Sequence, residues 1–251
     1  MSASAIPYHL RPHKAVDRRL FLDLLSRYER WRPLLEYVYV SMGAYPLEDH
    51  KLIHRIIGIT KLIAFDLDEE IVARQQFNKP IETCHCLTKK SGDMVAQLDT
   101  VLSECKFPTE SGIVIWLDYT DPSKIGEQIR EFETLLDKLR PGDVVRVTVN
   151  AHPHAGIDQS SNDGKPLLVD EKRARQFQKL RDRINDYLPS WAEPDHMTPT
   201  ELPLVLSEAF SAAALKALPV SEPNSFAPLD LPLNFHPAAI RASANVTPPA
   251  R

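Results

Sequence analysis

The stretch EYVYVSMGAYPLEDHKLIHRIIGITKLIAFDLD, residues 36–68, decides the fold. It predicts a strand, a glycine turn, an amphipathic helix, a second strand and an acid, at residues 37–41, 42–44, 47–57, 61–65 and 66. A glycine lets the backbone approach a ligand closely. An acid about twenty residues later, at the tip of the next strand, is placed to accept hydrogen bonds from ribose hydroxyls. The pattern is therefore typical of a nucleotide-binding half-fold, with Gly43 and Asp66 as its two markers.

The rest of the chain continues the alternation of strands and helices. Residues 112–117, GIVIWL, form a continuous apolar run, as expected of a strand buried on both faces. Further strands are expected at 82–87 and 144–149, and further helices at 14–31, 68–77, 94–105, 122–139, 171–188 and 200–218. This alternation indicates an α/β protein with a three-layer, mostly parallel sheet and helices on both faces.

The predicted organisation is one compact domain in three parts. These are an N-terminal helical segment, a cofactor-binding core, and a helical cap with a proline-rich tail, at residues 1–35, 36–160 and 161–251. All eight glycines lie at or before Gly164, whereas the last third is rich in proline. A chain of 251 residues can bury one full core, so several domains are not expected.

Composition and charge narrow the class of partner. The formal net charge of -4 gives no global attraction to nucleic acid or to an anionic membrane. The three cysteines are an odd number, and we see no signal peptide or long apolar span. A cytoplasmic protein with neither a nucleic-acid nor a membrane partner is therefore expected.

Polar residues gather where the predicted strands end. They lie at positions 41–45, 66–68, 89–93, 118–120 and 150–152. In parallel sheets ligands bind beyond the carboxyl ends of the strands. One rim is therefore expected to hold the binding residues.

Several phrases resemble the class I S-adenosylmethionine-dependent methyltransferases, which have a Rossmann-like fold. They are VSMGAY after the first strand, AFDLDEE after the second, VIWLDYTDP at the fourth, and LRPGDVVRVTVNA at the fifth. More narrowly, LIHRIIGI, RQQFNKPI, IWLDYT and VTVNA are similar to a bacterial group labelled "putative O-methyltransferase". The resemblance covers about residues 36–151 and implies no particular methyl acceptor.

The resemblance implies S-adenosylmethionine as the cofactor and a small molecule or a peptide as the acceptor. The cofactor-binding residues that it implies are Ser41, Met42, Gly43, Ala44, Tyr45, Asp66, Leu67, Asp93 and Asp118, and the catalytic candidates are Asp118, Tyr119 and His152. Asp66 would bind the ribose hydroxyls and Asp93, in an SGD turn, the adenine amino group. Asp118 and Tyr119 would lie beside the transferred methyl group.

Two departures from the family pattern stand out. The first loop has one glycine, Gly43, where the family usually has two or three, so Met42 and Tyr45 must be accommodated. The antiparallel pair of strands that normally closes the family sheet is not recognisable after Asn150. A sheet edge is therefore expected to be uncovered and available for oligomerisation.

Simpler roles stand beside these assignments. Asp66 and Asp118 could each cap the helix that follows, and Gly43 could be only a turn residue. If the acceptor must lose a proton, the candidate bases are Asp118, His152 and His154. Asp118 and Asn150 are oxygen ligands of the kind seen in magnesium-dependent enzymes, but Val149 stands where a further carboxylate is needed, so no metal is expected.

Two other functions remain open at this stage. An acid after the second strand would also suit a nicotinamide-dependent oxidoreductase, although the glycine triplet and a Tyr-Lys pair are missing. A non-catalytic binding module with the same fold is the other alternative. The trio Cys84-His85-Cys86 resembles half of a zinc site, but no second ligand pair follows, and Cys84 and Cys86 are expected in the core.

Overall fold

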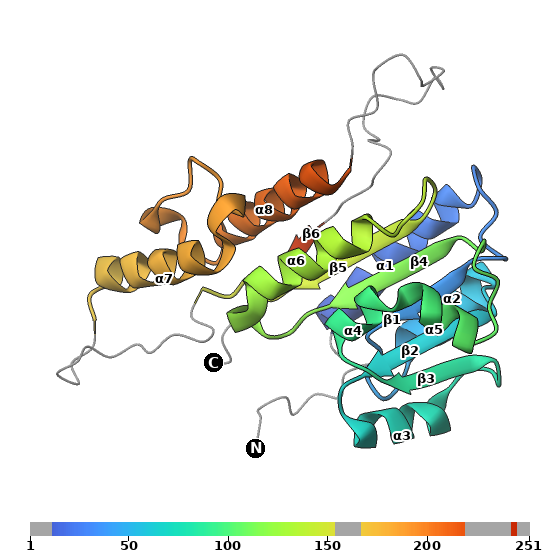
Figure 1. Cartoon of the computed structure of the whole chain (residues 1–251). Coiled ribbons are helices and arrows are strands. Elements are labelled where there is room, and N and C mark those ends of the chain that lie inside the picture. The colour runs from blue at the N-terminus through green and yellow to red at the C-terminus, as the bar shows by residue number, and fades with distance from the viewer. Residues whose placement is uncertain (1–11, 154–166, 219–241, 245–251) are drawn as a thin grey trace, which may run out of the picture. The chain divides into compact units, whose positions relative to one another are not determined.

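The structure is a computed structural model that describes residues 12–153, 167–218 and 242–244 (Figure 1). The chain divides into two compact units. Unit 1 consists of Met1–Leu117 and Leu139–Val145, and unit 2 of Asp118–Lys138 and Arg146–Arg251. Strands β4 and β5 each have residues in both units.

Unit 1 alternates helices and strands in the predicted order. Its elements are α1 (Pro12–Tyr28), β1 (Val38–Ser41), α2 (Glu48–Ile57), β2 (Lys61–Asp66), α3 (Glu69–Asn78), β3 (Cys84–Thr88), α4 (Ser91–Ala96), α5 (Leu98–Glu104) and β4 (Ile113–Asp118). The hydrogen-bonded strand order of the sheet is β3-β2-β1-β4-β5-β6. The neighbours β1 and β2, β1 and β4, and β2 and β3 all pair in parallel.

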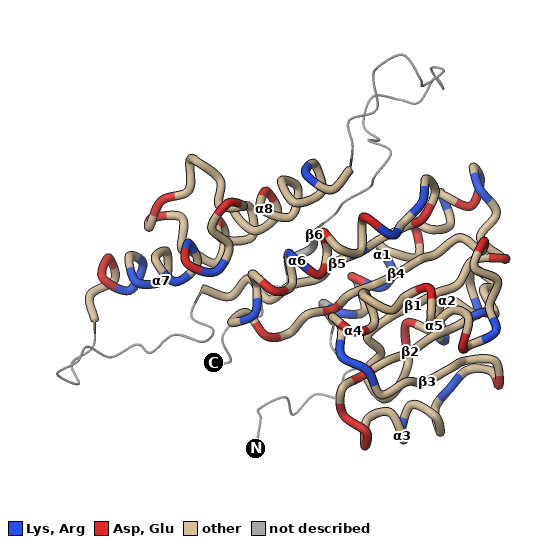
Figure 2. The backbone as a smooth tube through the Cα atoms, viewed as in Figure 1, with Lys and Arg blue, Asp and Glu red and all other residues tan. Residues whose placement is uncertain are grey.

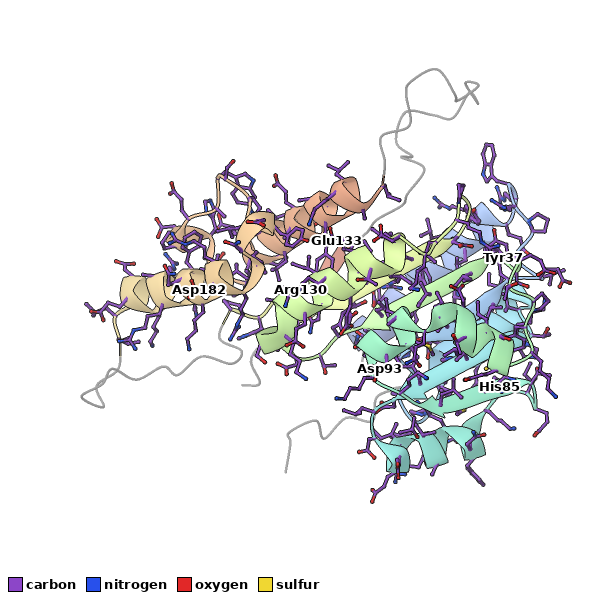
Figure 3. The ribbon with its side chains drawn as sticks, viewed as in Figure 1. Tyr37, His85, Asp93, Arg130, Glu133 and Asp182 are labelled. Atoms are coloured by element: carbon purple, nitrogen blue, oxygen red, sulfur yellow. The ribbon has the colours of Figure 1, made fainter. Side chains whose placement is uncertain are left out.

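Helices cover both faces of the sheet in unit 1. One face presents Tyr39, Leu62 and Cys84, which are paired in register and belong to one core with residues of α1 and α2. Phe21 of α1 packs edge-on against Trp116 of β4, with ring centroids 5.4 Å apart. The opposite face includes His85, labelled in Figure 3, whose ring packs against Phe107, just after α5, at 5.3 Å. The predicted three-layer α/β arrangement is therefore confirmed.

Local chemistry fixes where the helices of unit 1 begin and end. Asp68 caps α3, because its Oδ1 accepts hydrogen bonds from the N–H groups of Glu70 and Ile71 at 2.8 and 3.4 Å. Gly58 ends α2 with φ of 86°, a left-handed conformation that glycine adopts without strain. The loop from β2 to α3 is thereby held by its own polar groups.

Unit 2 contains the remaining helices. They are η2 (Pro122–Lys124), α6 (Ile125–Leu136), α7 (Val169–Ile184), η3 (Asn185–Tyr187), η4 (Pro194–His196) and α8 (Leu202–Ala217). Phe132 of α6 packs edge-on against Phe210 of α8 at 5.4 Å, and Figure 1 shows these two helices side by side. A Cβ added at Gly126 would lie 2.1 Å from the carbonyl oxygen of Arg183, so only glycine permits this approach of α6 to the end of α7.

Two further strands complete the sheet. They are β5 (Val144–Val149), which lies over the residues predicted, and β6 (Ala242–Ala244). Strand β6 pairs in parallel with Val147–Val149 of β5. The expectation of an uncovered edge is therefore wrong along these three residues. A three-residue Ala-Ser-Ala strand has no hydrophobic period by which to recognise it in the sequence.

The prediction from the sequence was wrong for one helix. The single helix expected over 94–105 is two helices, α4 and α5, which meet at Gln97. The backbone of Gln97, with φ of -107° and ψ of 20°, departs from helical geometry. The residues expected as a polar SGD turn form the first turn of α4. None of the described helices is long and apolar enough to cross a membrane.

Candidate functional site

The carboxyl ends of β1 and β2 lie side by side in unit 1. Ser41 is paired in register with Ala64, two residues before Asp66. The loop after β1 combines a buried Ser41 with a half-buried Met42 and an exposed Tyr45, and Leu67 after β2 is 62% exposed. Unit 1 thus brings together the predicted residues Ser41, Met42, Gly43, Ala44, Tyr45, Asp66 and Leu67 at one edge of its sheet.

Asp66 is a half-buried carboxylate at the tip of β2. Its Oδ1 accepts the N–H of Asp68 at 2.9 Å, while the capping of α3 falls to Asp68 itself. Its Oδ2 has no hydrogen-bond donor among the residues that the structure describes. One carboxylate oxygen therefore orients the side chain and the other can accept a bond from a ligand.

Gly43 packs closely against side chains on the path to α2. A Cβ at this position would lie 2.6 Å from Cδ2 of Leu47 and 3.1 Å from Cε1 of His50. The carbonyl oxygen of Gly43 accepts a hydrogen bond from Nε2 of Gln75, a fully buried side chain of α3. The loop therefore packs against α2 and is hydrogen-bonded to α3. These contacts hold its backbone in place independently of any ligand.

A buried polar network, which the sequence reasoning missed, lies beneath this loop. Oδ2 of Asp49 accepts hydrogen bonds from the hydroxyls of Tyr39 and Ser41 at 2.8 and 2.7 Å. Oδ1 of Asp49 lies 3.4 Å from Nδ1 of His50, and Nε2 of His50 is 3.0 Å from the carbonyl oxygen of Ile63. The helical spacing of His50, Ile53 and Ile57 is the signal that could have placed His50 inside, since all three are buried.

The electrostatics of this network favour a charged pair. Burial alone would raise the pKa of Asp49, but His50 and the hydrogen bonds from Ser41 and Tyr39 outweigh it and hold that pKa below its usual value. Burial likewise opposes charging of His50, yet Asp49 and the carbonyl of Ile63 raise its pKa above 6.5. Ser41, a predicted cofactor residue, is therefore anchored by a desolvated ion pair.

Asp93 lies in the first turn of α4, where it is exposed (Figure 3). A negative side chain in the first turn is stabilised by the helix dipole, and this accounts for Asp93 without a ligand. Its assignment to the adenine amino group stays a prediction.

Asp118 and Tyr119 belong to unit 2. Asp118 is half-buried at the end of β4, and capping of η2 is done by Asp121, whose Oδ1 accepts the N–H of Ser123 at 2.9 Å. The hydroxyl of Tyr119 is buried and donates to Oε2 of Glu131 on α6 at 2.7 Å. Burial, together with Glu131, raises the pKa of Tyr119 well above 10.0. Tyr119 is thus engaged in packing against α6, and its catalytic role stays a prediction.

His152 lines a pocket of unit 2. The turn after β5 is held by Oδ1 of Asn150, which accepts the N–H of His152 at 3.0 Å, while Nδ2 of Asn150 reaches the carbonyl oxygen of Thr120 at 3.4 Å. The pocket has a volume of about 40 Å³ and is also lined by residues of α7 and α8. The lining from α7 and α8 could not be foreseen, because these helices are distant from His152 in the sequence. His154 lies outside the described residues.

The described residues contain no cluster of ligands for either of the metal sites considered from the sequence. Among the described residues no group of three or more His, Cys, Asp and Glu side chains is placed to hold a metal ion. Cys84 and Cys86 are buried and free of disulfides, in one core with Ala64. The core position predicted for both cysteines is therefore confirmed.

Comparison with known protein families identifies the chain. A family model described as "Putative O-methyltransferase" matches residues 6–238. The chain belongs to this family. Comparison with curated proteins gives no match, and comparison with solved structures gives none.

Membership of the O-methyltransferase family confirms the resemblance seen in the loop and strand phrases and supports a methyltransferase function. The match covers both units, including the pocket residues of α7 and α8. It assigns no role to any single residue, so the geometry described above must support the site assignments.

Proposed function

We propose that this family member is an S-adenosylmethionine-dependent O-methyltransferase that acts on a small-molecule or peptide acceptor. The observation that carries the proposal is the Asp66 carboxylate at the tip of β2, with one oxygen bonded to Asp68 and the other available to a ligand. A carboxylate in this position of a parallel sheet is suited to the paired hydroxyls of a ribose.

The residues at the edge of unit 1 fit such a cofactor. Asp66 would accept from the ribose hydroxyls, and Leu67, which is largely exposed beside it, offers an apolar surface to a base. The loop from Ser41 to Tyr45 would hold the methionine part, with its backbone fixed in advance by Gln75 and Asp49. A loop that is ordered before binding loses less entropy when the ligand arrives.

Residues of unit 2 would serve the acceptor. S-adenosylmethionine, when bound, supplies a methyl group made electrophilic by its sulfonium. A hydroxyl acceptor must lose its proton as its oxygen takes the methyl group, and we assign that proton to the imidazole of His152, which lines the pocket. We assign to Asp118, half-buried at the end of β4, an orienting contact with the acceptor or the cofactor.

Calorimetric titration tests the cofactor assignment. We expect S-adenosylmethionine to bind the wild type and NAD to give no heat of binding. Replacing Asp66→Asn removes the charge that the ribose hydroxyls meet, and we expect the dissociation constant to rise about 10- to 100-fold, the range for charge-assisted hydrogen bonds.

The neighbouring carboxylate supplies a matched control. Asp68→Asn makes the same change of charge two residues away, and asparagine is an equally good helix cap, so binding is expected to stay within about twofold of the wild type. Binding of NAD in place of S-adenosylmethionine would indicate an oxidoreductase. Absence of binding by a folded sample, or equal losses in the two variants, would refute the assignment.

A further inference from the structure

The pocket of unit 2 has an unusual charge pattern. Four lining residues come from α7, and two of them, Lys179 and Arg183, are cationic and lie one turn apart on the same side of the helix. The third ionisable lining group is His152. No carboxylate lines the pocket among the described residues. The charged groups that a bound molecule would meet are therefore all basic.

The acidic residues near these cations accept hydrogen bonds from other groups, although the charge of Arg183 adds to the hydrogen bonds from Ser123 in lowering the pKa of Asp121. On α7 itself Asp182 accepts a hydrogen bond from Gln178 at 2.7 Å and is exposed, as Figure 3 shows for the labelled side chain. Asp121, before η2, is bonded to the backbone and hydroxyl of Ser123. Arg183 makes one long bond, 3.4 Å from Nη1 to the carbonyl oxygen of Pro122. A guanidinium has five N–H donors, so most of its donors remain for another acceptor.

The remaining wall has two amide side chains, Asn150 and Gln176, and is otherwise apolar. It includes Leu180 of α7, Met197 after η4, and Leu206 of α8, all of which are buried. A volume of about 40 Å³ admits the carboxylate group of a ligand but cannot enclose a nucleoside or an aromatic ring, so the body of an aromatic acid would extend from the pocket past its apolar side chains. Lys179 is exposed and therefore reachable from solvent. Figure 2 shows that α7 carries several basic residues along its length.

We propose that this pocket binds a carboxylate carried on an apolar body, with Lys179 and Arg183 holding the anion and the Met197 wall holding the carbon skeleton. As far as this ligand is a methyl acceptor, the assignment rests on the proposed function and narrows the acceptor to an apolar carboxylic acid. Guanidinium groups pair with carboxylates in a two-pronged geometry that an ammonium cannot match, so Arg183 is expected to contribute more than Lys179.

Methyl-group NMR of the full-length protein tests the proposal. The chain has four methionines, and protein labelled with ¹³C at the ε-methyl groups therefore gives few signals, with that of Met197 assigned through Met197→Leu. Benzoate is expected to shift the Met197 signal saturably. Benzamide has the same shape without the charge. Because it cannot form a charge-assisted hydrogen bond with the cations, it is expected to bind at least about tenfold more weakly.

Substitutions on α7 separate recognition from nonspecific charge effects. Arg183→Gln is expected to weaken benzoate binding about tenfold or more, and Lys179→Gln by a smaller factor. Arg181→Gln is the matched control, since Arg181 is exposed in the same last turn of the helix and does not line the pocket. It is expected to leave the affinity for benzoate unchanged.

The outcomes distinguish this proposal from the cofactor assignment. Three results would each overturn the proposal of a carboxylate pocket. They are a Met197 signal that does not shift when benzoate is added, equal affinities for benzoate and benzamide, and equal losses of benzoate affinity in Arg181→Gln and Arg183→Gln. None of these results depends on S-adenosylmethionine. Conversely, a failure of S-adenosylmethionine to bind would remove the proposed function while leaving a confirmed carboxylate pocket in place.

Discussion

The loop after β1 in unit 1 and the pocket of unit 2 hold their polar groups in opposite ways. Close to the loop, Asp49 and His50 are withdrawn from water and form an ion pair, and Asp49 accepts a hydrogen bond from Ser41. In the pocket, Lys179 is exposed and Arg183 makes one long bond. The first arrangement makes the strand end rigid before any ligand arrives, whereas the second keeps donors available. Substitutions in the buried pair should therefore lower the free energy of unfolding most. Substitutions of the pocket cations should instead change which ligands bind.

The largest expected effect comes from breaking the buried pair. Asp49→Asn leaves His50 without its charged partner and leaves a neutral amide oxygen as the acceptor for the hydroxyls of Tyr39 and Ser41, so we expect the free energy of unfolding to fall by about 3–5 kcal/mol. Urea denaturation followed by circular dichroism measures it.

A solvated ion pair in unit 2 provides the control for Asp49→Asn. Lys216 lies 2.9 Å from Glu133, but its side chain is 64% exposed, so Lys216→Gln is expected to leave the free energy of unfolding close to that of the wild type. Equal losses for Asp49→Asn and Lys216→Gln would show that burial does not set the energy of these pairs.

Glycine substitutions are expected to give the next largest loss of stability. One in each unit tests how tightly that unit packs around its glycine. Gly126→Ala places a methyl group against a backbone carbonyl, which cannot move without shifting α7, so a loss of about 2–3 kcal/mol is expected. Gly43→Ala meets the side chains of Leu47 and His50, which can adjust, and about 1–2 kcal/mol is expected. Thermal unfolding of both variants measures the order, and a greater loss in Gly43→Ala would contradict this account of the two contacts.

The smallest of the three effects is a pH dependence of stability. His50 has a folded pKa above its ordinary 6.5, so its contribution is complete below pH 6.5 and is lost as the pH rises through the folded pKa. The free energy of unfolding of the wild type, less that of His50→Gln, should therefore decline as the pH rises above about 6.5. A difference that is constant with pH, or that grows as the pH rises, would mean that His50 is not charged in the folded protein.

The sequence predicted the parts of the fold that depend on local apolar patterns. The run at 144–149 gave β5 exactly, and GIVIWL gave β4 to within one residue at each end. The break at Gln97 and strand β6 were missed because neither has a local apolar signal.

The residues of the candidate site likewise differ in whether a local sequence pattern points to them. Asp66 could be proposed from the sequence because a strand tip and an acid are adjacent there, and the structure does place it at the tip of β2. The pair Asp49–His50 and the pocket cation Arg183 were missed because their significance depends on groups brought near by folding, such as Ser41 and Met197. Periodicity could have placed His50 inward, but no sequence pattern indicates which polar groups it would meet there.

The most direct test of the central claim, a cofactor site at the end of β1 and β2, is the ¹³C spectrum of the methionine-labelled protein during titration with S-adenosylmethionine. Met42 lies in the loop after β1 and is half-buried, whereas Met94 is fully buried on α4. The account predicts a saturable shift of the Met42 signal, a smaller change at Met94, and a requirement for about tenfold more ligand in Asp66→Asn. A Met42 signal that stays in place at saturating S-adenosylmethionine, in a folded sample, would contradict it.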